Sequence, residues 1–210
     1  MISLHRTQTT RGEISIALSK RDGAVGYFKD GHLQTLIDAH GGNLAPHVNA
    51  IVQVLTQEAP ERVLVLGHGG GAASSMLHRL GMNVVSVDCD PRAGNLARLF
   101  FRAPPCLDVV VEDAATYVDT SPPACFDAIV VDFQDSLVTP AAYLSEGFWR
   151  GVDRLLRPGG AVLVNVTNRL HLGPDWRAFQ RALADAGLDA VALSDEFETG
   201  NRLLMTSCVR

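Results

Sequence analysis

From residue 62 onwards, short apolar runs alternate with longer segments whose apolar residues recur at helical spacing. The runs are rich in Val, Ile and Leu, which is typical of parallel strands buried on both faces. They predict seven strands, at residues 63–66, 84–87, 108–111, 126–131, 161–166, 190–193 and 203–207. The helical patterns predict helices at residues 44–59, 72–80, 91–103, 115–118, 140–156 and 174–186. Such an alternation is typical of an α/β protein whose largely parallel sheet has helices on both faces.

The last two predicted strands should run antiparallel to each other. Only residues 194–202 separate them, whereas a parallel crossover needs about a dozen residues or more. A seven-stranded sheet with its last strand reversed is the Rossmann-like sheet of class I methyltransferases. The all-parallel sheet of nicotinamide-binding proteins is therefore disfavoured.

The N-terminal segment follows a different pattern. Apolar residues alternate with others between Glu13 and Leu18, and Asp-Gly pairs at 22–23 and 30–31 are turn signals. Together with short apolar stretches before residue 38, they predict a small antiparallel meander. We therefore expect two parts, an N-terminal β appendage at residues 1–43 and a Rossmann-like S-adenosylmethionine-binding domain at residues 44–210.

Composition and charge exclude several classes of protein. Apolar residues make up 47% of the chain and charged residues 20%, which indicates a globular protein rather than a disordered one. A net charge of −5 argues against a nucleic-acid partner. The four cysteines lack CxxC spacing, so no metal site or disulfide framework is predicted. Without a signal-like N-terminus or an apolar run of membrane-spanning length, the expectation is a cytoplasmic protein with no membrane partner.

The first predicted strand runs into a glycine-rich turn that is typical of nucleoside binding. Gly67, Gly69 and Ala72 fit the G-x-G-x-x-G/A fingerprint, with Gly71 in the same turn. Asp88 ends the next strand, about 20 residues on, where a carboxylate can accept both hydroxyls of a ribose. The alternative is a purely structural strand-turn-helix. The coincidence of glycines, strand and acid favours the nucleoside site.

More acids follow the next two strands, where ligands bind in open α/β sheets. Asp113 could contact the adenine or cap the helix after it. Asp132 and Asp135 could hold or deprotonate an acceptor amine or hydroxyl, although Asp135 could also stabilise a turn. Two further expectations are structural, with Asn165 ending its strand and His68 facing solvent in the glycine loop.

The chain resembles the spermidine synthase family, in its short bacterial branch with the class I methyltransferase fold. The matching motifs run in order from residue 62 to the end: LVLGHGGGA, VVSVDCDP, VVVEDAATYV, FDAIVVDFQDS, RLLRPGGAVLVNV and GNRLLM. The N-terminal match is short, with Gln34 in the place of a family glutamine, which implies a substrate-binding role.

The resemblance implies a role for each matching acid. Asp88 corresponds to the acid that binds the ribose, and Asp113 and Ala114 correspond to the adenine contacts. Asp132 corresponds to the aspartate that helps deprotonate the attacking amine. Asp135 corresponds to the second acid of that loop, which holds the polyamine substrate.

The chain departs from the family at several positions. Gly70 stands where polyamine synthases carry the aspartate that binds the aminopropyl amine of decarboxylated S-adenosylmethionine, and residues 47–49 replace a Tyr-His-Glu run. The loop after Asp135 also lacks the usual Asp-Pro. A methyltransferase using S-adenosylmethionine and a small-molecule acceptor is therefore the first expectation. The alternatives are an aminopropyltransferase, a non-catalytic nucleoside-binding module and, more distantly, a nicotinamide oxidoreductase. The β appendage could pair across a homodimer.

Overall fold

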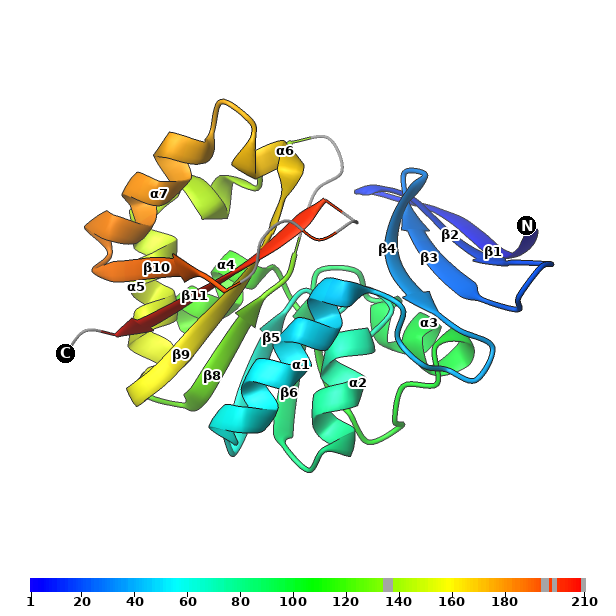
Figure 1. The fold of residues 1–210 in the computed structure, drawn as a ribbon, viewed down its shortest axis with the longest axis horizontal. Coiled ribbons are helices and arrows are strands. Elements are labelled where there is room, and N and C mark those ends of the chain that lie inside the picture. Colours follow the sequence, from blue (N-terminus) through cyan, green and yellow to red (C-terminus); the bar gives the residue numbers. More distant parts are fainter. Residues whose placement is uncertain (134–137, 194–196, 198–199, 209–210) are drawn as a thin grey trace.

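The computed structural model of the protein describes residues 1–133, 138–193, 197 and 200–208. It contains a seven-stranded sheet with helices on both faces and a separate four-stranded antiparallel sheet at the N-terminus (Figure 1). None of the helices in these residues is both long enough and apolar enough to cross a membrane.

The central sheet has the strand order β10-β11-β9-β8-β5-β6-β7. Its strands are β5 (Arg62–Leu66), β6 (Asn83–Asp88), β7 (Asp108–Val111), β8 (Phe126–Val131), β9 (Leu156–Thr167), β10 (Leu188–Ala192) and β11 (Asn201–Cys208). Strands β5 to β9 pair in parallel, and β11 is antiparallel to both β9 and β10. The predicted seven strands and the reversed last strand are both confirmed.

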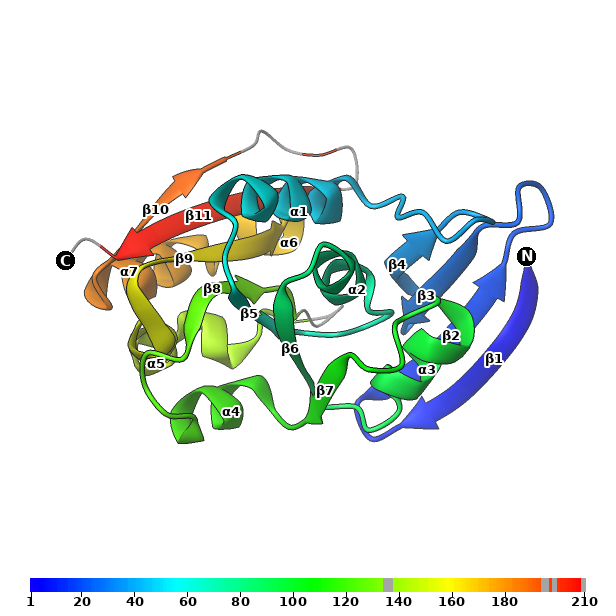
Figure 2. The same cartoon turned by 90° about the horizontal axis from the view of Figure 1, so that it is seen from below.

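Helices cover the two faces of the central sheet (Figure 2). They are α1 (Pro46–Glu58), α2 (Ala72–Arg79), α3 (Ala93–Phe100), α4 (Ala114–Thr120), α5 (Glu146–Leu155), α6 (Asn168–His171) and α7 (Trp176–Asp185), with a 3-10 turn η1 (Ala141–Leu144). Alternate residues of β5 face opposite sides: Val63 and Val65 pack with α1 and α2, whereas Leu64 and Leu66 pack with α4, α5 and α7. This burial on both faces explains the unbroken apolar runs.

The helix predicted at residues 140–156 is divided at Ser145. This residue has an extended backbone, and its side chain accepts a hydrogen bond from the Phe148 amide, which caps α5. Apolar residues at helical spacing continue through the break, so the pattern alone did not reveal it. The sequence also gave no sign of the single-turn helix α6.

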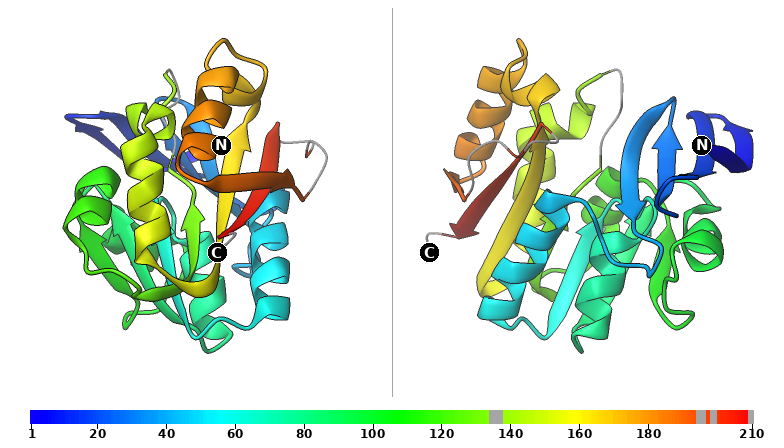
Figure 3. Two further views of the ribbon diagram at one scale, coloured as in Figure 1. Left: turned by 90° about the vertical axis from the view of Figure 1, so that its left-hand side faces the viewer. Right: turned by 45° about the vertical axis from the view of Figure 1, so that its right-hand side comes forward.

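The N-terminal sheet is a meander of β1 (Ile2–Thr9), β2 (Gly12–Leu18), β3 (Val25–Lys29) and β4 (His32–Ile37). Strand β1 was not predicted, because it is mostly exposed and has no clear apolar alternation. Ile14, Ile16 and Tyr27 pack against Leu96 and Phe101 in and after α3. Figure 3 shows the sheet beside the main body, next to α3.

Polar contacts also join the N-terminal sheet to the main body. The Arg102 guanidinium donates to the carbonyl oxygens of His40 (2.7 Å) and Ala39 (3.0 Å). Arg92 Nη1 donates to Thr7 Oγ1 at 3.0 Å. Because these contacts and the apolar packing beside α3 involve three strands and one loop, the sheet is held against the body along much of its length.

Candidate active site

A cavity of about 450 Å³ opens between the N-terminal sheet and the carboxyl ends of the central strands. One wall is the beginning of β4, and the other is formed by the carboxyl end of β9 and the start of β11. The lining residues are His32, Leu33, Gln34, Thr35, His47, Gly67, His68, Gly69, Asp132, Asn165, Thr167, Arg169 and Asn201. Most of these side chains are polar, whereas ligand pockets are usually lined mainly by apolar side chains, which favours a polar ligand here.

The glycine loop after β5 needs glycine for a different reason at each position. Gly67 has a φ of +102°, and a Cβ there would lie 2.5 Å from the carbonyl oxygen of Asp132. At Gly69, with a φ of +52°, the nearest atom to a Cβ would be Thr35 Oγ1 at 3.6 Å, so this position faces open space in the cavity. The loop can therefore let a ligand approach its backbone at Gly69.

Thr35 of β4 fills the space beside Gly70. The Gly70 amide donates a hydrogen bond to Thr35 Oγ1 at 3.1 Å, and a Cβ on Gly70 would lie only 2.8 Å from the Thr35 Cβ. The aspartate that the resemblance places at this position would therefore have no room. The N-terminal sheet occupies that part of the site.

Asp88, at the end of β6, holds the glycine loop in place. Its Oδ2 accepts hydrogen bonds from the amides of His68 and Gly69, both at 3.0 Å, and its Oδ1 accepts one from Asp90 at 2.8 Å. A carboxylate offers about four lone-pair positions, so one remains for a ribose hydroxyl. The residue is half-buried next to the cavity, and its ribose contact stays a prediction.

The expectation that His68 faces solvent is wrong. Its side chain is only 5% exposed and packs beneath the loop, with Nδ1 3.0 Å from Ser86 Oγ and 3.3 Å from Ser74 Oγ. Burial lowers its pKa to about 4, although the nearby Asp88 opposes this shift. The ring is therefore neutral at pH 7 and forms a buried polar support for the loop.

Asp132 follows β8 and takes part in a chain of side-chain hydrogen bonds. Asn165 Nδ2 donates to Asp132 Oδ1 at 2.7 Å, and Asn201 Nδ2 donates to Asn165 Oδ1 at 3.0 Å. Burial raises the pKa of the Asp132 carboxyl, while His47 and the bond from Asn165 partly lower it. A carboxylate with a raised pKa is a stronger proton acceptor than one in water.

A hydrogen bond from Tyr143 also fixes the backbone after Asp132. Tyr143 is almost fully buried, and its hydroxyl donates to the carbonyl oxygen of Phe133 at 2.7 Å. Tyr143 therefore does more than fill the core, because it fixes the backbone that follows Asp132.

Asn165 does more than end its strand, because its amide donates a hydrogen bond to the Asp132 carboxylate. The signal for Asn165 was an amide inside an apolar strand, because a buried amide there needs a hydrogen-bond partner.

Asp113 caps the helix that follows it, as one of the two readings of the sequence expected. Its Oδ1 accepts from the amides of Ala115 (3.0 Å) and Thr116 (3.4 Å). Its Oδ2 lies 3.4 Å from a guanidinium nitrogen of Arg11, at the tip of the β1–β2 hairpin. Both charged side chains are about half exposed, so the pair contributes little stability. The adenine contacts of Asp113 and Ala114 stay predictions.

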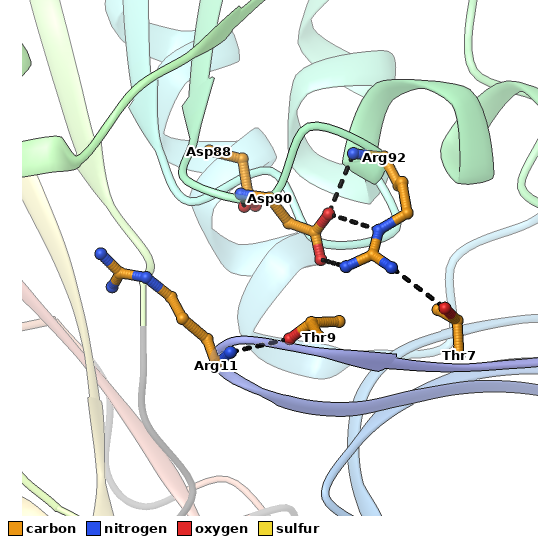
Figure 4. Close-up of polar contacts among 6 residues, drawn as sticks. All are labelled: Thr7, Thr9, Arg11, Asp88, Asp90 and Arg92. Carbon is orange, nitrogen blue, oxygen red and sulfur yellow. Dashed lines mark hydrogen bonds and ion pairs between the residues drawn. The ribbon is translucent and has the colours of Figure 1, made fainter.

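Asp90 has a structural role beside Asp88 (Figure 4). It accepts hydrogen bonds from the Arg92 amide and from Arg92 Nε, both at 2.9 Å, near the start of α3. Burial opposes ionisation, but these bonds lower the pKa of the Asp90 carboxyl overall. Arg92 in turn reaches Thr7, while the Arg11 side chain extends from the same hairpin away from Asp90 and Arg92.

The structure brings together some of the residues that the sequence singled out. Gln34, Gly67, Gly69 and Asp132 line one cavity. Asp88, Asp113 and Ala114 lie outside that lining, at the ends of the neighbouring strands β6 and β7. Gly71 is the N-cap of α2, where a Cβ would lie 2.9 Å from the His68 ring. Asp135 lies outside the described residues, so its role stays a prediction from the sequence. The lining residues that the sequence did not single out include Thr35, Arg169 and Asn201.

Replacing Asp88 with alanine should weaken nucleoside binding by about 10- to 150-fold. The change removes a charged hydrogen-bond acceptor, worth roughly 1.5–3 kcal/mol, for the ribose and for the loop amides. Calorimetric titration with methylthioadenosine would measure the loss. Asp108→Ala, at the far end of the neighbouring strand, is a matched control, and equal affinity in both variants would remove Asp88 from the site.

Comparisons with known proteins place these features in a family context. A family model described as a methyltransferase domain matches residues 64–164. Polyamine aminopropyltransferase from Aeropyrum pernix is 34% identical over 125 residues, covering 54% of this chain and 40% of that protein. Spermine synthase from Arabidopsis thaliana is 29% identical over 122 residues, covering 54% of this chain and 34% of that protein. The chain spans less than half the length of each of these two relatives.

Solved structures extend the similarity to the N-terminal sheet. A probable spermidine synthase from Corynebacterium glutamicum superposes with a TM-score of 0.77 and 19% identity, covering 97% of this chain and 79% of that one. A spermidine synthase in complex with the transition state analogue AdoDATO gives a TM-score of 0.76 and 16% identity, covering 98% and 73%. The chain therefore has the Rossmann-like fold of the spermidine synthases, and its central region is related in sequence to the polyamine aminopropyltransferases.

Proposed function

We propose that the protein transfers an aminopropyl group from decarboxylated S-adenosylmethionine to the amine of a small-molecule acceptor. The observation that carries the proposal is the half-buried carboxylate of Asp132, with its raised pKa, in the same cavity as the open glycine loop. The relatives support aminopropyl transfer. Methyl transfer, the first expectation from the sequence, has support only from the domain-level family match.

The residues present fit a nucleoside of this kind. Gly69 leaves space for the ligand next to its backbone, and Asp88 keeps a lone pair for a ribose hydroxyl. Asp113 and Ala114, after the neighbouring strand, would contact the adenine, and Gln34 would contact the substrate from the opposite wall. The bound donor supplies a carbon activated by a positively charged sulfur.

Asp132 would act as the general base. The acceptor nitrogen bonds to the aminopropyl carbon that is attached to sulfur. The bond between that carbon and sulfur breaks and its electron pair stays on sulfur, which leaves methylthioadenosine. Asp132 would accept the proton that the nitrogen loses. A protonated amine has no lone pair to attack with, so a nearby proton acceptor is needed. Asn165 and Asn201 would keep the carboxylate oriented toward the cavity.

The two transfer reactions leave different nucleosides, which makes the proposal testable. We expect methylthioadenosine to accumulate when the protein is incubated with decarboxylated S-adenosylmethionine and a panel of amines. S-adenosylmethionine with the same amines should release no S-adenosylhomocysteine. Release of S-adenosylhomocysteine instead would establish methyl transfer, and nucleoside binding without either product would indicate a binding module.

A further inference from the structure

A second charged group faces the cavity that contains Asp132. Arg169 belongs to the short helix α6, which begins directly after β9, and its side chain lines the cavity wall together with Thr167. Arg169 is exposed. Within the part of the chain that the structure describes, its guanidinium has no hydrogen-bond or ion-pair partner. Its five donors are therefore available to a ligand.

The charges on the described lining of the cavity are unusual for a site that would bind a diamine. The ionisable lining residues are His32, His47, His68, Asp132 and Arg169. Among them there is one carboxylate, which burial makes harder to ionise, and one permanent cation. His68 is neutral at pH 7 because of its lowered pKa. Among the described lining residues, a ligand with two ammonium groups would thus meet one negative side chain, and would also meet a guanidinium.

We propose that the acceptor carries a carboxylate as well as an amine, and that Arg169 binds this carboxylate. The inference rests on the proposed function, because it names the class of substrate for the same site. Asp132 would face the reacting amine, and the guanidinium would pair with the carboxylate in the bidentate geometry that suits these two groups. The acceptor class is therefore an amino acid, whose carboxylate offsets the charge of one ammonium group, rather than a simple diamine.

Pairs of acceptors that differ only in a carboxylate test this proposal directly. L-ornithine differs from 1,4-diaminobutane in this way, and L-lysine differs from 1,5-diaminopentane. We expect each amino acid to bind the protein at least about tenfold more tightly than its diamine, in calorimetric titrations with methylthioadenosine present. Arg169→Ala should remove that preference, and Arg169→Lys should keep part of it.

A matched variant separates the effect of position from that of charge. Arg177 is an exposed arginine in α7 that does not line the cavity, so Arg177→Ala makes the same charge change elsewhere. This variant should keep the wild-type preference. Equal loss in both variants would mean that the effect is a general one of net charge, and would overturn the assignment of Arg169.

The carboxylate could instead belong to the nucleoside, since S-adenosylmethionine retains one and its decarboxylated form does not. Titration of both nucleosides into wild type and Arg169→Ala distinguishes these sources. A loss of affinity confined to S-adenosylmethionine would overturn the acceptor assignment. Diamines that bind as well as the amino acids would also overturn it, even if methylthioadenosine is released. Absence of nucleoside binding would count against the proposed function alone, because the acceptor pairs can also be titrated without nucleoside.

Discussion

Replacing Asp132 with asparagine should lower turnover by about 10²-fold or more while nucleoside affinity stays nearly unchanged. The amide has the size of the carboxylate and can still accept the hydrogen bond from Asn165, but it cannot take a proton from an amine. General bases typically contribute about 10²- to 10⁴-fold to the rate. Turnover would be measured as methylthioadenosine released from decarboxylated S-adenosylmethionine, and affinity by calorimetry.

The pH dependence of the same reaction provides an independent check. Asp132 must be ionised to accept a proton, so the rate should fall as the pH drops through its pKa, which burial places above the ordinary value. The hydrogen bond from Asn165 stabilises the ionised form. Asn165→Leu should therefore raise that pKa and move the acidic fall in rate to higher pH. A parallel loss of nucleoside affinity in Asp132→Asn would instead make Asp132 a binding residue.

Gly69→Val should abolish nucleoside binding in a protein that still folds. A side chain at this position would project into the open space of the cavity, where the nearest atom to a Cβ is 3.6 Å away. The branched side chain would block the approach of a ligand to the loop backbone. The left-handed backbone adds about 1–3 kcal/mol of strain, so a lower melting temperature is also expected.

Gly81 provides the control for this backbone strain. It also has a positive φ, of +92°, and a Cβ there would meet nothing within 4 Å. Gly81→Val should lower the melting temperature and leave nucleoside affinity unchanged. If Gly69→Val binds the nucleoside normally, the glycine at this position serves the turn and not the ligand.

The predictable parts of the fold are those in which burial alone decides the pattern. Strands β5 and β8 are covered on both faces, so their runs of Val, Leu and Ile mark them almost to the residue. Strand β1 lies at the edge of the N-terminal sheet with most of its residues exposed, and no apolar alternation marks it. The break at Ser145 depends on one side-chain cap inside an otherwise helical pattern.

The candidate site was predictable where it lies at strand ends and unpredictable where it depends on tertiary contacts. The positions of Asp88 and Asp132 follow from the order of strands along the chain. The burial of His68 depends on Ser74 and Ser86, which come from two other elements, so no local pattern reports it. Arg169 follows a strand in a polar segment, and only the folded chain shows that it shares a cavity with Asp132.

The cavity joins distant parts of the chain, and this has a consequence during protein synthesis. Thr35 supports the glycine loop from near the start of the sequence, whereas Asn201 completes the chain of hydrogen bonds to Asp132 from near its end. Domains fold as units while the ribosome adds residues in order. The glycine loop and β11 belong to the same central sheet, so the bond from Asn201 and the complete site can form only after β11 has left the ribosome. A ribosome-bound chain that ends before residue 201 should therefore not hold Asp132 in its final orientation.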